Sequence, residues 1–128
     1  MAGPARAGAL IYANDLSRLS AFYQHLLSMR LIHSDAEHHV IGSDDMQLII
    51  QAIPAHIASS IVISSPPEPR SEQAIKLFFT MPSITDAAAV ANSLGGSLFG
   101  QQYTGPGFIV RNGYDPEGNI FQVREVAP

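Results

Sequence analysis

The stretch DPEGNIFQV, Asp115 to Val123, joins a turn to a strand and decides how the rest of the chain is interpreted. Asp, Pro and Gly within four residues are typical of a tight turn, because each tolerates or pre-forms turn backbone. Successive strand side chains point to opposite faces, so Phe121 and Val123 share one face and Gln122 lies on the other. We expect the apolar face to pack under a helix and Gln122 to point away from it.

The pattern of strands and helices occurs twice along the chain. Apolar residues recur three and four positions apart from Leu16 to Ser28, which predicts an amphipathic helix capped by Asn14 or Asp15. A second helical stripe follows Ser83 and ends at the glycine pair 95–96. Short apolar runs predict strands at 9–13, 31–34, 38–42, 46–52, 75–81, 97–99, 108–111 and 119–123.

One strand–helix–strand–strand–strand (βαβββ) unit is therefore present twice, with Asp15 and Ser83 at equivalent helix starts. The length of 128 residues fits a single domain, 1–128. We place the first module at 8–53, a linker rich in proline and serine at 54–74, and the second module at 75–126. The predicted fold class is α+β, with two βαβββ modules pairing to form a curved mixed sheet that encloses a cleft.

The composition excludes several classes of function. Hydrophobic residues make up 46% of the chain and charged residues 14%, which is typical of a globular domain and favours an oligomer. There is no cysteine, so disulfides and thiolate metal sites are excluded. Seven Lys and Arg are scattered along a chain of net charge −4, without the basic patch that a nucleic-acid binder normally shows.

The apolar runs also bear on location. All of them are far shorter than a membrane span, so we expect no membrane partner. The first fifteen residues contain no hydrophobic stretch of signal-peptide length, and we expect a cytoplasmic protein.

Three segments together resemble the vicinal oxygen chelate superfamily, the group of glyoxalase I, extradiol dioxygenases and bleomycin-resistance proteins. ANDLSRLSAFYQHLLSMRL resembles its first-helix signature, with Tyr23, Leu27 and Leu31 matching and Ser28 standing where glycine is usual. IKLFFTMPSITDAAAVANSLGG resembles the start of the second module, and DPEGNIFQV resembles its closing strand. The resemblance covers nearly the whole chain except residues 56–72.

The resemblance implies a divalent metal site in metal-dependent members, with ligands on the first and last strand of each module. In the first module, the family's ligand positions correspond to Gly8 and Ile49, and Gln47 is the next candidate on the same strand face. The second module's positions are Lys76 and Gln122. Glycine and isoleucine offer no ligand and lysine brings a positive charge, so we predict no metal ion and no other cofactor at these positions.

The resemblance therefore implies a metal-free, bleomycin-resistance-like protein that binds an unknown small molecule by sequestration, as a homodimer. The rival hypothesis is a metal-dependent lyase, isomerase or dioxygenase with displaced ligands. A third is a regulatory or assembly module with a degenerate pocket. Whether any catalysis occurs stays open at this point, and no catalytic residue is assigned.

Six residues are the predicted ligand contacts. Lys76 and Gln122 would point into the cleft and bond an anionic or carbonyl ligand, and the others are Gln47, Ile49, Arg111 and Tyr103. Tyr103 flanks the TGPG segment, read as a flexible loop.

The remaining polar clusters are interpreted as structural. The five histidines show no chelating spacing, and the neighbours His38 and His39 should face opposite ways. The acid pair Asp115 and Glu117 is predicted to be a solvated turn.

Overall fold

Two compact units make up the structure, a computed structural model that describes residues 5–128. The first unit ends at Val62 and the second begins at Ile63. Their boundary falls inside the predicted linker 54–74. Residues 1–4, which belong to the predicted domain 1–128, lie outside the described residues.

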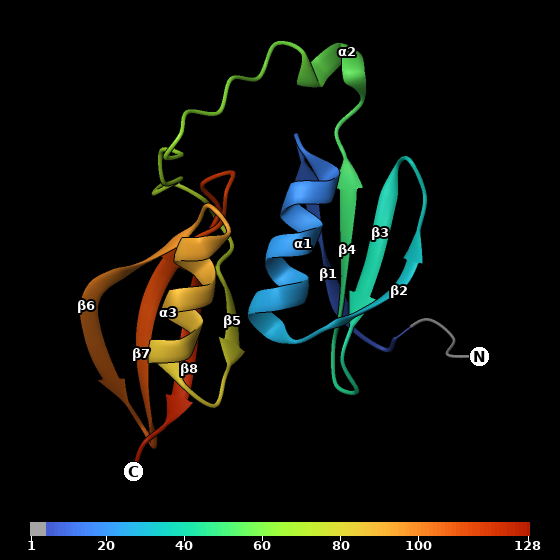
Figure 1. Cartoon of the computed structure of the whole chain (residues 1–128). Coiled ribbons are helices and arrows are strands. Elements are labelled where there is room, and N and C mark those ends of the chain that lie inside the picture. Colours follow the sequence, from blue (N-terminus) through green and yellow to red (C-terminus); the bar gives the residue numbers. More distant parts are fainter. Residues whose placement is uncertain (1–4) are drawn as a thin grey trace. The chain divides into compact units, whose positions relative to one another are not determined.

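The first unit is one βαβββ module followed by a short helix (Figure 1). Its strand order is β1-β4-β3-β2, with β1 parallel to β4 and the other neighbours antiparallel. The elements are β1 (Gly8–Ala13), α1 (Leu16–Leu27), β2 (Arg30–Ser34), β3 (His38–Gly42), β4 (Gln47–Ala52) and α2 (Ala55–Ala58).

Helix α1 forms where the apolar spacing predicts it. The Asp15 side chain accepts a hydrogen bond from the Arg18 amide, which satisfies one of the amide groups left free at a helix start. The helix ends at Ser28, whose φ of 52° is left-handed. Its buried face packs on β3 and β4, where Ile41, Leu48 and Ile50 are fully buried.

The second unit repeats the module, with strand order β5-β8-β7-β6 (Figure 1). Strand β5 runs parallel to β8, and the other neighbours are antiparallel. The elements are β5 (Leu77–Thr80), α3 (Ile84–Ser93), β6 (Ser97–Gly105), β7 (Phe108–Tyr114) and β8 (Ile120–Val126). The predicted fold class, α+β with two βαβββ modules, is confirmed.

Helix α3 covers one face of this second sheet. Ser83 caps it by accepting from the Asp86 amide, as the sequence predicts. At the same end, the Ile84 amide donates to the Glu125 carboxylate of β8 at 2.7 Å. Phe121 and Val123 are buried on the helix side, which confirms the predicted apolar face of the closing strand.

The turn before β8 is buried, which corrects the prediction of a solvated acid pair. Asp115 is 0% exposed and Glu117 6%. One Asp115 carboxylate oxygen accepts from the Glu117 and Asn119 amides, and the other accepts from the Asn119 side chain at 2.8 Å. The short acidic side chain is therefore the structural centre of the turn.

The cover over this turn comes from the segment predicted as linker. The Arg70 amide donates to the Gly118 carbonyl at 2.8 Å, and the Arg70 Nε donates to the Glu117 carbonyl. The Gln73 side chain donates to the Ile120 carbonyl and accepts from its amide, as a neighbouring strand would. Residues 68–73 are thus folded onto the second unit rather than free.

Two other boundaries differ from prediction. Strand β6 continues to Gly105, so Tyr103 lies in a strand and only the residues 106–107 form the turn. Its polar, exposed residues form an edge strand, which apolar patterning does not reveal. The start of the predicted linker 54–74 forms the short helix α2, Ala55–Ala58. Among the described residues, no helix is both long enough and apolar enough to cross a membrane.

Gly118 is the position where glycine is required in the buried turn. Its φ is 87°, and a Cβ there would collide with the carbonyl oxygen of Glu68. We expect Gly118→Ala to lower the free energy of unfolding by about 2 kcal/mol, measured by denaturant titration. Gly100→Ala is the matched control, because a Cβ at Gly100 meets nothing within 4 Å. Equal effects at both glycines would contradict this account of the turn.

Candidate functional site

The face of the second sheet opposite α3, here called the helix-free face, carries the predicted residue Gln122. Paired residues on neighbouring strands share a face. Gln122 pairs with Phe78 on β5 and with Asn112 on β7. Arg124 pairs with Thr80 and Val110 in the next row. Central strand β8 thus presents an amide and a guanidinium on the face that α3 leaves uncovered.

Arg124 is the residue of this face that the sequence prediction missed. Its guanidinium carbon lies 3.9 Å from the centroid of the Phe78 ring and 4.4 Å from that of Phe108. Its Nη2 donates to the Gln122 Oε1 at 3.3 Å. Its Nε is buried and finds no acceptor among residues 5–128. Strand alternation places Arg124 on the same face as Gln122, so the sequence predicts which face it occupies. The contacts with Phe78 and Phe108 could not be predicted in this way.

Lys76 reaches the same face from the segment just before β5. It is exposed, and its Nζ donates to the Asn112 Oδ1 at 3.4 Å. Asn112 is also the cross-strand partner of Gln122. The structure therefore brings the predicted pair Lys76 and Gln122 to one shared neighbour, Asn112.

Arg111 and Tyr103 are placed differently from each other. Arg111 pairs with Val123, so it lies on the face that α3 covers and not beside Gln122. Its Nε donates to the Phe99 carbonyl at 2.7 Å. The donors of Arg111 therefore serve the irregular part of β6, whereas the sequence placed this residue among the predicted ligand contacts. Tyr103 pairs with Val110 on the helix-free face and is 51% exposed.

The first unit holds the other two predicted residues in a shallow hollow. Gln47 and Ile49 share the face of β4 opposite α1, and their partners on β1 are Gly8 and Leu10. These residues and Ala5–Ala9 line a hollow of about 350 Å³. The Gln47 Oε1 accepts from the Ala5 amide at 3.4 Å, so this side chain closes one wall.

The residues at the implied metal positions do not suit a cation. A Cβ at Gly8 would collide with the Gln47 carbonyl oxygen. No metal-ligating side chain therefore fits at that backbone position. The Gln122 oxygen already faces the Arg124 guanidinium, and Lys76 adds a second positive charge to that face. Like charges oppose cation binding, and the donor set lacks the carboxylates and imidazoles that bind divalent ions.

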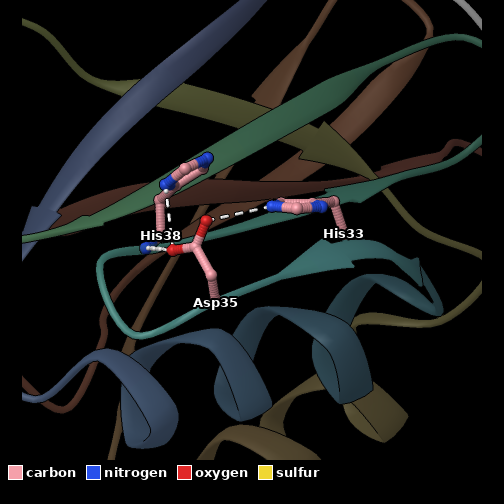
Figure 2. Close-up of side chains that lie close together, drawn as sticks. All are labelled: His33, Asp35 and His38. Atoms are coloured by element: carbon pink, nitrogen blue, oxygen red, sulfur yellow. Dashed lines mark hydrogen bonds and ion pairs between the residues drawn. The ribbon is translucent and has the colours of Figure 1, made fainter.

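A second cluster lies in the first unit, at the turn between β2 and β3. Figure 2 shows the Asp35 carboxylate between the rings of His33 and His38. The His33 Nε2 lies 3.0 Å from one carboxylate oxygen, and the His38 Nδ1 lies 3.2 Å from the other. The hydrogen bond from His33, with those from the Glu37 and His38 amides, holds the pKa of the Asp35 carboxyl well below its usual range.

Sequence spacing gave no reason to group these histidines. As predicted, His38 and His39 face opposite ways, because His39 bonds the Ser20 hydroxyl of α1 at 2.7 Å. His33 joins His38 because the β2–β3 register shifts between Leu31 and His33 and pairs His33 with Val40. A register shift of this kind cannot be predicted from the spacing of apolar residues.

Comparison with known proteins gives a family match and a fold match. The model of the glyoxalase-like domain family matches residues 9–124. No curated protein sequence matches the chain significantly. Among solved structures, an enzyme of the glyoxalase/bleomycin resistance protein/dioxygenase family from Burkholderia phytofirmans PsJN is 18% identical, with a TM-score of 0.70 and 94% of this chain and 97% of that chain covered.

Two further solved structures are similar. The fosfomycin resistance protein FosX from Listeria monocytogenes is 13% identical, with a TM-score of 0.67 and coverage of 98% of this chain and 96% of that chain. A bleomycin-binding protein complexed with bleomycin is 14% identical, with a TM-score of 0.62 and coverage of 97% and 100%. At these identities the likeness shows the fold.

The stacking of Arg124 on Phe78 is measurable as a coupling free energy. We expect the double-mutant cycle of Arg124→Gln and Phe78→Leu to give about 1 kcal/mol of coupling in unfolding experiments, because a partly desolvated guanidinium on a ring is stabilised by this amount. Arg18→Gln on the exposed side of α1 combined with Phe78→Leu should be additive. Additivity in the first cycle would show that the stack contributes nothing.

Proposed function

Because the chain belongs to the glyoxalase-like domain family, we propose that it binds a small molecule on the helix-free face of its second sheet, without a metal ion at the family's usual positions. The observation that carries the proposal is the Arg124 guanidinium, held between two aromatic rings and beside the Gln122 amide. A guanidinium that is fixed before binding loses little side-chain entropy when a ligand accepts its hydrogen bonds.

The charges of this face indicate the class of ligand. Lys76 and Arg124 supply two cations, and the described strands β5, β7 and β8 place no carboxylate beside them, since Glu125 faces α3. The exposed ring of Phe78 adds an apolar surface. We therefore infer a ligand with anionic or carbonyl oxygens next to a flat apolar part.

Sequestration fits this face better than catalysis. All five histidines occur before residue 63, so none belongs to the second unit. The side chains that β5, β7 and β8 place on this face include neither histidine nor carboxylate, the commonest general acid–base groups. Binding of a small molecule also agrees with the bleomycin-binding protein of the same fold, which was solved in complex with bleomycin. The homodimer expected from the sequence stays a prediction.

The charge preference is testable with three probes of one shape, namely benzoate, benzamide and benzamidine. We expect benzoate to bind more tightly than benzamide and benzamidine not to bind, as followed by shifts of backbone amide resonances of β5 and β8. Arg124→Gln should weaken benzoate binding by about tenfold or more, because a charge-assisted hydrogen bond is lost. Arg18→Gln is the matched control and should leave it unchanged. Preference for benzamidine would overturn the proposal.

The two antibiotics associated with the similar folds are the next probes. Fosfomycin is a phosphonate and bleomycin is cationic, so the charges on this face favour the former. We expect fosfomycin, and not bleomycin, to raise the melting temperature through binding to the folded state.

The rival, a metal-dependent enzyme with displaced ligands, predicts a divalent ion whose binding depends on Gln122. We expect Gln122→Ala to leave the affinity for Zn²⁺, Ni²⁺ and Mn²⁺ unchanged in calorimetric titration, because its oxygen faces a guanidinium. Gln101→Ala, at an exposed position of β6, controls for removing an amide. An ion bound tightly by the wild type and lost only in Gln122→Ala would favour the enzyme.

A further inference from the structure

We propose that the turn between β2 and β3 binds one divalent transition-metal ion through His33, Asp35 and His38. These three side chains each offer one ligand atom, and the atoms all lie within 4.8 Å of one another. The cluster lies on β2, β3 and their turn, whereas the metal positions implied by the family resemblance lie on or beside β1, β4, β5 and β8. It is therefore a separate site.

The backbone of the turn holds the central ligand in place. The Asp35 amide donates to the His38 carbonyl at 3.0 Å and closes the turn. The Asp35 Oδ1 accepts from the Glu37 and His38 amides at 2.8 and 2.9 Å. Oδ2 makes no such backbone contact and lies 3.0 Å from the His33 Nε2. One oxygen thus fixes the carboxylate while the other remains directed at the histidine (Figure 2).

The turn is also anchored to the centre of its sheet. The Ala52 amide at the end of β4 donates to the Glu37 carbonyl at 2.7 Å, and the Gln51 side chain donates to the same oxygen. The shifted register pairs His33 with Val40, which places it on the same face as His38. Both rings consequently approach Asp35 from one side of the sheet, with centroids 5.2 Å apart.

Each imidazole lies close to one oxygen of the Asp35 carboxylate. Zinc lies about 2.0 to 2.1 Å from imidazole nitrogen and carboxylate oxygen, so tetrahedral ligand atoms are about 3.3 Å from each other. The His33 Nε2–Oδ2 distance of 3.0 Å and the His38 Nδ1–Oδ1 distance of 3.2 Å are near this length, and each ends on a different carboxylate oxygen. To share one ion, both rings would rotate so that their nitrogens face a common point beside the carboxylate.

The donor set selects the kind of ion. Two imidazoles and one carboxylate suit Zn²⁺, Cu²⁺ or Ni²⁺, whereas Ca²⁺ and Mg²⁺ prefer oxygen ligands alone. The His33 and Asp35 side chains are 55% and 43% exposed, so the remaining coordination positions face solvent. The Asp35 carboxylate supplies a negative charge that offsets the cation.

The test uses Zn²⁺ alone with the full chain, free of any histidine tag, in calorimetric titration. We expect one Zn²⁺ per chain. His33→Gln and His38→Gln should each weaken Zn²⁺ binding by about tenfold or more. Loss of a residue that only hydrogen-bonds a metal ligand already lowers metal affinity by about this factor, so loss of a ligand should cost at least as much. Asp35→Asn keeps an oxygen acceptor for the turn amides but loses the charge, and should weaken binding similarly.

Two exposed histidines provide matched controls, His25 on α1 and His56 on α2. His25→Gln and His56→Gln should leave the Zn²⁺ affinity unchanged. As a second readout, imidazole nitrogen resonances of His33 and His38 should shift on adding one equivalent of Zn²⁺, while those of His25 and His56 stay in place. Folding of each variant is checked by its backbone amide spectrum.

The absence of saturable 1:1 binding would overturn the proposal, as would equal losses in the control variants. Zn²⁺ binding that survives His33→Gln and His38→Gln but is lost in Gln122→Ala would overturn it too, and would also contradict the metal-free small-molecule site. The failures of the two proposals are thus distinguishable.

Discussion

The Asp115 carboxylate sets the register on which the second unit depends. Buried and bonded to two backbone amides and one side-chain amide, it fixes where β8 begins after the turn. A slip of one residue would exchange the faces of the strand. Phe121 and Val123 would then lose their cover by α3, and the guanidinium of Arg124 would be buried under the helix. Both the core and the candidate site follow from this one turn.

The segment 68–73 protects that register. Through Arg70 and Gln73 it satisfies the backbone of residues 117–120, which would otherwise be an exposed turn and strand start. Gly118 permits the approach, because its positive φ and missing Cβ leave room for the Glu68 carbonyl. A stretch with the composition of a linker thus acts as part of the second unit's packing.

The two copies of the module differ in chemistry although they share a topology. The first unit contains every histidine of the chain, and its turn between β2 and β3 gathers two of them around a carboxylate. The second presents cations, amides and aromatic rings on its helix-free face. In neither unit do the residues at the family's usual metal positions suit a metal ion. One duplicated scaffold can therefore host unrelated sites, since the fold constrains the core face and leaves the other face free.

The amino-acid pattern alone predicts both main helices, their caps at Asp15 and Ser83, the duplicated module and the face of Gln122. These features depend on local periods of 3.6 and two residues, which side-chain patterning displays directly. Four other features become visible only in the folded chain. They are the stacking of Arg124, the hydrogen bonding of Arg111 to β6, the burial of Asp115 and Glu117, and the proximity of His33 to His38. The physical reason is that these depend on strand register, shifted by irregular pairing in β2 and β6, and on contacts between residues about 47 positions apart. Neither register shifts nor such distant contacts leave a periodic signal in the chain.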